Sequence, residues 1–514
     1  MTGMISIVWD GTMDLHYVKE KNSFCTMVEH WYWRDGWRSL LILFSFAISL
    51  PILAASDELP PSVKRKLLQS GIPQHAIGVY VQEIGAVKPT LAINADQAMN
   101  PASVMKLLTT YAGLELLGPA YTWPTRIFAY GKMSQGILQG DLVIKGYGDP
   151  RLDLGHFWSL IYQLRQTGLQ NIQGNLILDR THYEIPYHDP GDFDGKPYRS
   201  YNALPEALMV NYRATTLHFF PQSENNTVRV VLDPDSNSLR IQNHLQLTQN
   251  ACGDWRNALT TDVLLDEVSK NHFTIIVGGK FSIQCGKQSI ILSLQDSATY
   301  IQDVFKRLWT EQGGKFSGYV IEAKVPQDAI LLDTYSSLPL AEIIRGINKY
   351  SNNIAARQLY LALGTGSDML NDSPATLEKS HLAVQNWLRS KRLNFPELVI
   401  ENGSGLSRKE RISVRHMGKI LMAAYQSPVM SEFMSSLPIA ATDGTLKNRF
   451  ADTAAKGRAH LKTGALDNVR ALAGYVLDYM GRRHVIVFFI NHDHAEKSRG
   501  VMDALVQWIV GRSQ

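Results

Sequence analysis

The sequence predicts a discontinuous α/β domain with an inserted β-rich region, and three observations lead to this fold class. Apolar residues alternate over 77–81, as in a strand, and an apolar helical stretch follows over 103–117. Short β-like runs separated by Gly, Asp, Asn and Pro then fill 123–325. Helical patterning resumes only after 326 and ends in paired strands. We therefore expect one α/β domain built from 57–122 and 326–514, interrupted by one or two β-rich modules at 123–325.

The elements can be placed in chain order from these patterns. The helix over 103–117 ends where Gly118 and Pro119 follow it. The clearest β-like runs of the insertion are Leu138–Lys145, Thr227–Leu232 and Phe273–Val277. Four later stretches have helical patterning, namely Leu338–Ile347, Asn352–Leu363, Ala375–Leu388 and Ile412–Tyr425. The chain closes with two strands and a helix, over Ala471–Leu477, His484–Ile490 and Ala495–Val510.

Residues 1–56 are predicted to be a leader that contains a secretory signal peptide. Arg34 and Arg38 precede an apolar run over 40–55 that ends in small residues. The run is short for a membrane span of about 20 residues, which favours a cleaved signal over an uncleaved anchor. Because signal peptides rarely carry so long a polar leader, Met27 is a candidate start. The mature chain is expected to be periplasmic, and soluble or only peripherally attached to membranes.

Composition and charge limit the class of protein. The chain has 514 residues, of which 45% are apolar and 19% charged, so it can bury a large core. Its formal net charge of +4 is spread along the sequence and forms no basic run. This predicts weak attraction to an anionic polymer such as a cell wall, and no nucleic-acid partner.

The number of cysteines in the expected mature chain is consistent with an exported protein. Cys25 falls before the expected mature chain, which leaves Cys252 and Cys285 as its only pair. An even count in an exported protein favours a disulfide. The alternative is two separately buried thiols, because a free cysteine packs as a small apolar residue.

Three short motifs could together supply acyl-transfer chemistry, which needs a nucleophile, a base, oxyanion donors and a grip on the substrate. The first is Ser103-Val104-Met105-Lys106. A serine and a lysine three apart at a helix start lie on the same face, and the helix N-terminus favours negative charge on the serine. Alone, the pattern also fits a helix cap with a solvated lysine.

The second motif is Lys462-Thr463-Gly464, followed by Ala465. On an exposed strand edge, the glycine lets a substrate backbone lie close while the lysine holds a carboxylate. The third is Ser351-Asn352-Asn353, in which the serine and the second asparagine could both point into a cleft. Ser-x-Asn is a weak pattern, and the triplets at Ser200, Ser223 and Ser269 are read as loops.

In this chain order the three motifs resemble the signature set of the penicillin-binding proteins and serine β-lactamases. From Ser103 to Ser351 there are 248 residues, which is similar to the low-molecular-mass class C penicillin-binding proteins of the peptidase S13 family. That resemblance implies a transpeptidase/β-lactamase-like domain with an antiparallel sheet flanked by helices. It also implies D-alanyl-D-alanine carboxypeptidase or endopeptidase activity on peptidoglycan peptides, acylation by β-lactams, and no cofactor or metal.

Further segments resemble the same family over most of 75–510. They are Pro101-Ala102-Ser103, Gly146-Tyr147-Gly148-Asp149-Pro150, Asn402-Gly403-Ser404-Gly405-Leu406-Ser407-Arg408, Asp443-Gly444-Thr445-Leu446 and His460-Leu461-Lys462-Thr463-Gly464. The chain departs from the family pattern at two positions. Asn402 stands where an aspartate is expected, and Ala465 stands where a serine is frequent, which could alter substrate contacts.

The resemblance implies a role for each matched residue. Ser103 is the acylated nucleophile, Lys106 its neutral base, and Ser351 passes a proton to the leaving amine. Asn353 holds the acyl part of the substrate, and Lys462 and Thr463 bind the terminal carboxylate. Gly464 belongs to the same substrate-binding strand, and the N–H groups of Ser103 and Ala465 form the oxyanion hole.

Other readings remain open from the sequence. A β-lactamase or esterase of the same superfamily, or a non-catalytic wall-binding penicillin sensor, would carry similar motifs. His484, His492 and His494 lie close in sequence but are read as ordinary histidines and not as metal ligands. Asp189, Asp192 and Asp194 lack the spacing and the distal glutamate of a calcium loop.

Overall fold

The computed structural model describes residues 57–266, 272–366 and 373–511. The predicted leader and signal peptide, including Cys25 and Met27, lie outside these residues. None of the described helices is both long enough and apolar enough to cross a bilayer.

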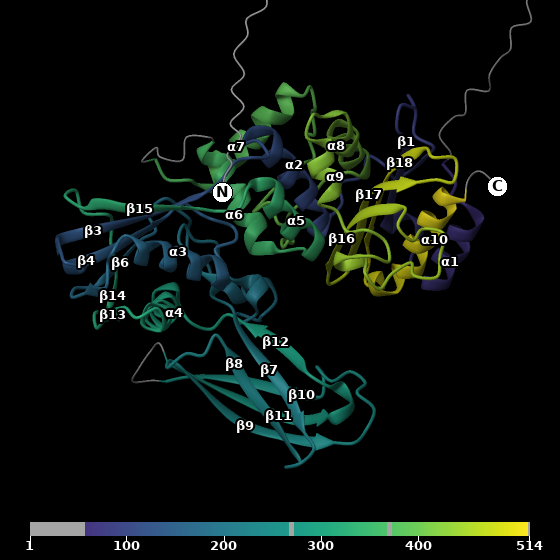
Figure 1. Ribbon diagram of the computed structural model, residues 1–514. Coiled ribbons are helices and arrows are strands. Elements are labelled where there is room, and N and C mark those ends of the chain that lie inside the picture. The colour runs from purple at the N-terminus through teal and green to yellow at the C-terminus, as the bar shows by residue number, and fades with distance from the viewer. Residues whose placement is uncertain (1–56, 267–271, 367–372, 512–514) are drawn as a thin grey trace, which may run out of the picture. The chain divides into compact units, whose positions relative to one another are not determined.

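A five-stranded antiparallel sheet forms the centre of the α/β part of the chain (Figure 1). Its strands, in spatial order, are β16 (Ala459–Leu466), β17 (Val469–Leu477), β18 (Arg483–Asn491), β1 (Ile77–Glu83) and β2 (Leu91–Ile93). Every neighbouring pair is antiparallel. The first strand of the described chain therefore pairs with the last one, which confirms the predicted discontinuous α/β fold class.

Alternate residues of this sheet pack into two different helical layers, as expected where side chains point to opposite faces in turn. Val79, Val81 and Phe488 belong to the core shared with α1 (Pro61–Ser70) and α10 (Arg499–Val510). The neighbouring side chains Tyr80, Val487 and Phe489 belong to a second core. That core is shared with six helices, α2 (Lys106–Leu116), α5 (Leu340–Tyr350), α6 (Asn353–Thr365), α7 (Leu377–Ser390), α8 (Val414–Gln426) and α9 (Met430–Ser435).

Most of the predicted helices are present with ends shifted by a few residues. The four helices predicted over 338–425 correspond to α5, α6, α7 and α8, and the predicted final helix corresponds to the 3-10 turn η8 (Ala495–Ser498) and α10. The short helix α9 (Met430–Ser435) was not predicted. The helix expected to start at Ser103 starts instead as a 3-10 turn, η2 (Ala102–Met105), before α2 begins at Lys106.

The inserted region contains a mixed seven-stranded sheet. Its strands are β3 (Pro124–Ser134), β4 (Ile137–Gly146), β5 (Asn171–Ile172), β6 (Leu176–Asp179), β13 (Lys315–Phe316), β14 (Val320–Glu322) and β15 (Ile330–Ser336). Two helices pack on this sheet, α3 (Leu154–Gln166) and α4 (Ser297–Glu311). Neither was predicted, because the sequence indicated only β-rich modules here. Strand β15 begins after residue 325 and pairs with β3. The division of the chain at 122 and 326 stays a prediction.

Two three-stranded sheets make up the bridged module, defined as the described residues of 215–292. One sheet is β12-β7-β8 and the other is β10-β11-β9. Their strands are β7 (Thr215–Gln222), β8 (Thr227–Asp233), β9 (Leu239–Thr248), β10 (Leu259–Leu265), β11 (Phe273–Ser282) and β12 (Gln288–Leu292). Both sheets contribute to one apolar core that includes Phe219, Val277 and Phe281.

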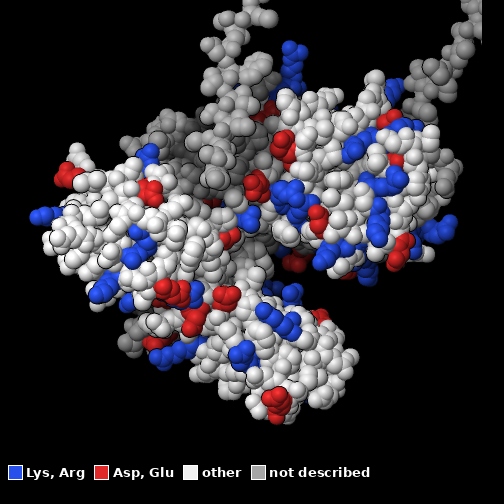
Figure 2. Space-filling view, in the orientation of Figure 1, with Lys and Arg blue, Asp and Glu red and all other residues white. Residues whose placement is uncertain are grey.

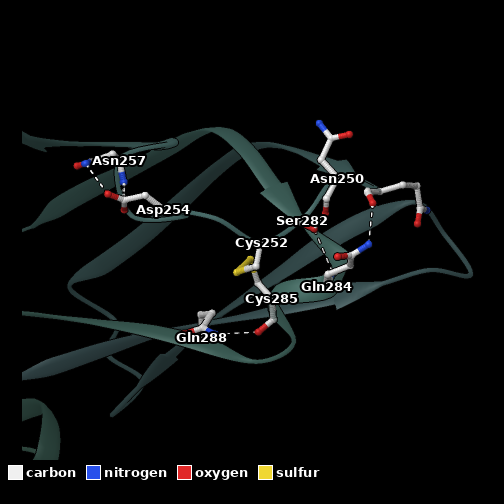
Figure 3. The surroundings of a disulfide bond; sticks show 9 residues. Asn250, Cys252, Asp254, Asn257, Ser282, Gln284, Cys285 and Gln288 are labelled. Atoms are coloured by element: carbon white, nitrogen blue, oxygen red, sulfur yellow. Dashed lines mark hydrogen bonds between the residues drawn. A yellow bond between two sulfur atoms is a disulfide. The ribbon is translucent and has the colours of Figure 1, made fainter. Parts of the chain in front are cut away.

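A disulfide between Cys252 and Cys285 confirms the predicted pairing (Figure 3). It joins the segment after β9 to the 3-10 turn after β11, across 33 residues of sequence. Beside it, Ser282 donates a hydrogen bond to the carbonyl oxygen of Asn250, and Gln288 donates one to that of Cys285 at 2.7 Å. The disulfide thus lies within a region already joined by polar contacts.

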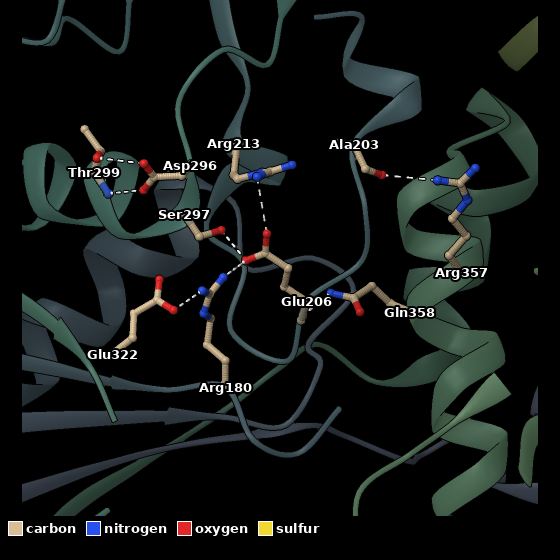
Figure 4. A network of polar contacts seen from close by, with 10 residues as sticks. All are labelled: Arg180, Ala203, Glu206, Arg213, Asp296, Ser297, Thr299, Glu322, Arg357 and Gln358. Carbon is tan, nitrogen blue, oxygen red and sulfur yellow. Dashed lines mark hydrogen bonds and ion pairs between the residues drawn. The ribbon is translucent and has the colours of Figure 1, made fainter. Parts of the chain in front are cut away.

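Glu206 connects the insertion to helix α6 (Figure 4). Its carboxylate accepts from Arg180 at 2.5 Å and from Ser297, and it lies 3.3 Å from an Arg213 nitrogen. Its backbone carbonyl accepts from Gln358 of α6 at 2.7 Å. Because α6 begins at Asn353, these contacts connect the insertion to the helix that carries one of the predicted site residues.

Acidic and basic side chains are interspersed on the face that Figure 2 shows. This pattern agrees with the small net charge of +4.

Candidate active site

Ser103 lies in the 3-10 turn η2, and Asn100 holds this turn in place. The side-chain oxygen of Asn100 accepts from Ala102 N–H at 2.8 Å, and its amide donates to the Ser407 carbonyl at 2.8 Å. Asn491 of β18 pairs with the Asn100 backbone through bonds of 2.8 and 3.1 Å. Ala102 has φ of 45°, a strained value for a residue with a Cβ. The position of Ser103 is therefore fixed by a loop, a strand and its own helix.

Two glycines allow the backbone to approach this turn closely. A Cβ on Gly405, whose φ is 79°, would lie 2.0 Å from the carbonyl oxygen of Ala102. A Cβ on Gly464 of β16 would lie 2.8 Å from that of Pro101. Only glycine fits at these two contacts. They let the 402–408 loop and the Lys462-Thr463-Gly464 strand both pack against the serine turn.

Lys106 is fully buried one helical turn after Ser103. Its ammonium nitrogen lies 3.0 Å from Ser103 Oγ and 2.6 Å from Asn353 Oδ1. It also contacts the backbone carbonyl oxygen of Ser404. The geometry is that of a base within reach of the hydroxyl proton it would remove.

Burial is the largest cause that holds the pKa of Lys106 well below its usual value. The charge of Lys462 lowers it further, and Arg357 adds a smaller effect in the same direction. Glu410 acts in the opposite direction. This carboxyl is itself fully buried, and burial raises its pKa. The surroundings of Lys106 thus favour the neutral amine, which is the form a base must have.

Ser351 and Asn353 lie where two helices meet. Ser351 ends α5 with left-handed backbone angles, φ 60° and ψ 39°, and Asn352 caps α6 by accepting from Ala355 N–H at 3.0 Å. Asn353 is the first residue of α6. The sharp reversal between the helices directs Ser351 toward Lys462 and Asn353 toward Lys106.

Lys462 joins the second and third motifs. Its nitrogen donates to Ser351 Oγ at 2.8 Å and to the Thr463 carbonyl oxygen at 2.8 Å. The side chain is fully buried, and burial lowers its pKa to about 7. Lys106 and Lys462 therefore connect all three motifs: Lys106 contacts Ser103 and Asn353, and Lys462 contacts Ser351.

Strand β16 is an edge strand of the five-stranded sheet. On its side away from β17, no other strand of the described residues pairs with it. A short segment covers only its beginning, where Leu461 N–H donates to the Pro438 carbonyl at 2.9 Å. In an antiparallel sheet the backbone groups of alternate residues face the same edge. Those of Thr463 and Ala465 consequently face outward, where an extended peptide could pair with them.

The 402–408 loop explains why an asparagine can replace the expected aspartate at 402. Asn402 Oδ1 accepts from the N–H of Ser404 at 2.9 Å and from its hydroxyl at 2.6 Å, as a carboxylate would. Its amide also donates to the Leu406 carbonyl at 3.1 Å, which a carboxylate could not do. The substitution keeps the turn that presents the Ser404 carbonyl to Lys106.

Several residues that support the site were not identified from the sequence. Asn100 and Asn491 act through contacts between segments far apart in the chain, and Arg357 and Glu410 act on Lys106 through their buried charges. Ser404 belongs to a segment that resembles the family, but the resemblance implies no role for it. A buried acid and a buried arginine have no local sequence signal, because their significance depends on what folds around them.

The histidines and aspartates considered as metal ligands in the sequence form hydrogen bonds within the protein. His484 is buried and lies 3.1 Å from Asp478, whereas His494 N–H donates to His492 at 3.0 Å. Asp189 accepts from Gly191 N–H at 2.7 Å, and Asp194 accepts from Tyr201 at 2.7 Å. Of the remaining Ser-x-Asn triplets, the one at Ser269 lies outside the described residues.

Comparison with known proteins gives consistent matches along the chain. The model of the D-Ala-D-Ala carboxypeptidase 3 (S13) family matches residues 59–511. D-alanyl-D-alanine carboxypeptidase DacB of Haemophilus influenzae is 25% identical over 458 residues, which cover 87% of this chain and 91% of that protein. A D-alanyl-D-alanine carboxypeptidase of an Actinomadura species is 27% identical over 414 residues, covering 78% of this chain and 74% of the relative.

A solved structure agrees at the level of the fold. The crystal structure of penicillin binding protein 4 (dacB) from Haemophilus influenzae superposes with a TM-score of 0.69 at 24% identity. The match covers 87% of this chain and 99% of that one.

Proposed function

The chain belongs to the D-Ala-D-Ala carboxypeptidase 3 (S13) family, and from that membership we propose that it hydrolyses peptidoglycan peptides through an acyl-enzyme on Ser103. The chain is a serine-type hydrolase of the D-alanyl-D-alanine carboxypeptidase class. The observation that carries the assignment of residues is the 3.0 Å contact between Lys106 Nζ and Ser103 Oγ, in surroundings that favour a neutral lysine.

In the acylation step, Lys106 takes the proton of Ser103 while the serine oxygen attacks the carbonyl carbon between two D-alanines. The N–H groups of Ser103 and Ala465 stabilise the oxyanion. The carbon–nitrogen bond then breaks, and Ser351 passes a proton to the departing amine. This proton path is supported by the Lys462–Ser351 contact of 2.8 Å, which ties Ser351 to a second source of protons.

In the deacylation step, water attacks the ester carbonyl carbon and the bond to the Ser103 oxygen breaks. The hydroxyl of the water stays on the shortened peptide, and its other proton reaches the Ser103 oxygen through Lys106. Asn353 holds the acyl part of the substrate in both steps, while Lys462 and Thr463 hold the carboxylate of the D-alanine until it leaves in the acylation step. The free edge of β16 supports this assignment, since the backbone at Thr463 and Ala465 faces outward, with Gly464 between them. No step requires a metal or an organic cofactor.

β-Lactams would acylate the same serine, because their amide carbonyl and carboxylate take the places of those of the substrate. The related penicillin binding protein 4 of Haemophilus influenzae has been solved in complex with a novel β-lactam. A β-lactamase would release the acyl group rapidly, and a non-catalytic sensor would not turn over peptides. We favour the peptidase with carboxypeptidase activity, endopeptidase activity or both.

We place the enzyme outside the cytoplasm, where its substrate lies, and in the periplasm in particular. The apolar run over 40–55 and the disulfide between Cys252 and Cys285 support this location.

The test compares the wild type with Ser103→Ala. Both proteins are incubated with a fluorescent penicillin and examined by intact-mass analysis, and D-alanine release from a D-alanyl-D-alanine pentapeptide is measured. We expect a long-lived adduct and D-alanine release in the wild type and neither in the variant. Release at the normal rate by Ser103→Ala would refute the mechanism, and rapid loss of the adduct would favour a β-lactamase.

A further inference from the structure

The subsite for the leaving D-alanine lacks a hydroxyl at position 465. Side chains two apart on a strand lie on the same face, so Thr463 and Ala465 are neighbours on β16. Ala465 is exposed and offers no hydrogen bond from its methyl group. If this strand alone bound the carboxylate, Thr463 would be its only hydroxyl donor.

A second hydroxyl reaches the subsite from another segment. Thr445 lies in the 3-10 turn η7 (Gly444–Leu446), and its Oγ1 is 2.9 Å from Oγ1 of Thr463. The Thr445 side chain is exposed, as an incoming ligand requires. The two hydroxyls form a pair of donors beside Lys462, although only Thr463 belongs to one of the three motifs.

The turn that carries Thr445 is held firmly to the end of α5. Asp443 accepts from Lys349 Nζ at 2.6 Å and from Ile439 N–H at 2.9 Å. Lys349 is buried and also donates to the Leu437 carbonyl at 2.8 Å. Lys349 lies two positions before Ser351, and Asp443 lies two positions before Thr445. The ion pair between Lys349 and Asp443 therefore fixes the segments that carry both of these residues.

We propose that Thr445 is a specificity-determining residue that binds the terminal carboxylate of the substrate together with Thr463. A hydroxyl has one proton to donate, and in the free enzyme one of the two protons lies between the threonine oxygens. When a carboxylate enters, each threonine donates to one of its oxygens, and Lys462 supplies positive charge. Thr445 thus supplies the second hydroxyl that Ala465 does not. The inference rests on the proposed peptidase function.

The experiment measures second-order acylation rates with a penicillin that has a free carboxylate and with its methyl ester. Thr445→Val removes the hydroxyl at nearly constant shape, and Thr445→Ser retains it. We expect Thr445→Val to lower the rate with the free acid about tenfold, as for the loss of a hydrogen bond to a charged group. The rate with the ester should change less than about twofold, and Thr445→Ser should remain close to the wild type with both compounds.

A second change distinguishes ligand binding from a structural effect. Adding Ala465→Ser to Thr445→Val places a hydroxyl back in the same subsite, now from strand β16 and not from the turn η7, and we expect it to restore most of the lost rate. An unchanged rate in Thr445→Val overturns the inference, as does an equal loss for acid and ester that Ala465→Ser does not restore. Failure of the wild type to be acylated at all would instead refute the proposed function.

Discussion

The cleft, as we call the active-site residues Ser103, Lys106, Ser351, Asn353 and Lys462, has two fully buried lysines beside polar groups, whereas the bridged module buries an apolar core and closes it with a disulfide. Neither Lys106 nor Lys462 has a carboxylate among its hydrogen-bond partners in the described residues; those partners are hydroxyl, amide and carbonyl oxygens. A buried ammonium in such surroundings destabilises the folded state unless it loses its proton. Among the described residues of the module, the buried polar side chains are the uncharged Thr215, Ser238 and Ser282.

The difference indicates that the buried lysines needed for catalysis lower the stability of the folded protein at the active site. The cleft keeps its shape because two large cores enclose the central sheet, and the module depends on a small core and a covalent link. We therefore expect changes in the cleft to alter rates far more than folding. Changes in the disulfide should alter local stability far more than rates.

The largest effect is expected for Lys106→Met, which removes the base and leaves an apolar side chain of similar length. Acylation by penicillin should slow by about a thousandfold, because general-base catalysis and activation of the serine are both lost. The melting temperature should change little, since the cost of burying an ammonium disappears together with its hydrogen bonds. Stopped-flow acylation and thermal unfolding measure the two effects.

Lys391→Met is a matched control for that experiment, because Lys391 pairs with Glu115 and has no part in the proposed mechanism. It should be acylated at the wild-type rate. If Lys106→Met were acylated as rapidly as Lys391→Met, Lys106 could not be the base, and the contrast between the cleft and the module would lose its main support.

The same contrast explains what the sequence could predict. Ser103 and Lys106 are three residues apart and Lys462-Thr463-Gly464 is contiguous, so local spacing was enough to identify them. The disulfide followed from the count of two cysteines in the expected mature chain, which excludes Cys25. How Ser351 and Asn353 approach two different lysines depends on the junction between α5 and α6, which no local pattern encodes.

Two errors have physical reasons. Helices α3 and α4 were not predicted, because the Gly- and Asp-rich turns around them are typical of a β-rich region. The buried residues of α3 do follow helical spacing; they are Phe157, Leu160, Ile161 and Leu164. The helix at Ser103 begins as a 3-10 turn because Ala102, with φ of 45°, is packed against Gly405. That packing involves residues about 300 positions away in sequence, so propensity could not reveal it.

An intermediate effect is expected when the disulfide is removed in the double variant Cys252→Ser and Cys285→Ser. Closing a loop of 33 residues should stabilise the module by about 3 to 4 kcal/mol. Amide hydrogens of β9 and β11 should therefore exchange several hundredfold faster, at about tenfold for each 1.4 kcal/mol, as measured by mass spectrometry. The rate of penicillin acylation should stay within about twofold of the wild type, because the proposed mechanism uses no residue of 215–292.

Treatment of the wild type with a thiol reductant should reproduce the faster exchange and should have no effect on the double variant. A large loss of acylation in either case would mean that the module supports the cleft directly. The two regions would then not be stabilised independently.

The last effect concerns the dependence of stability on pH, is smallest for each single pH unit, and uses Lys462→Met. The pKa of Lys462 is lowered by burial to about 7 in the folded protein, whereas an unfolded lysine titrates near its ordinary value of about 10.4. Between these values the unfolded state binds one more proton than the folded state. Raising the pH across this window therefore stabilises the wild type, by at most about 1.4 kcal/mol per pH unit.

The methionine variant lacks this group, so the free energy of unfolding of the wild type minus that of Lys462→Met should increase from about pH 7 to pH 10. Taking the difference cancels the titration of groups that both proteins share. Chemical denaturation at several pH values measures it. A flat difference for Lys462→Met would mean that Lys462 keeps its proton throughout, stabilised by Ser351 and the Thr463 carbonyl. The cleft would then differ from the bridged module in charge without any cost in stability.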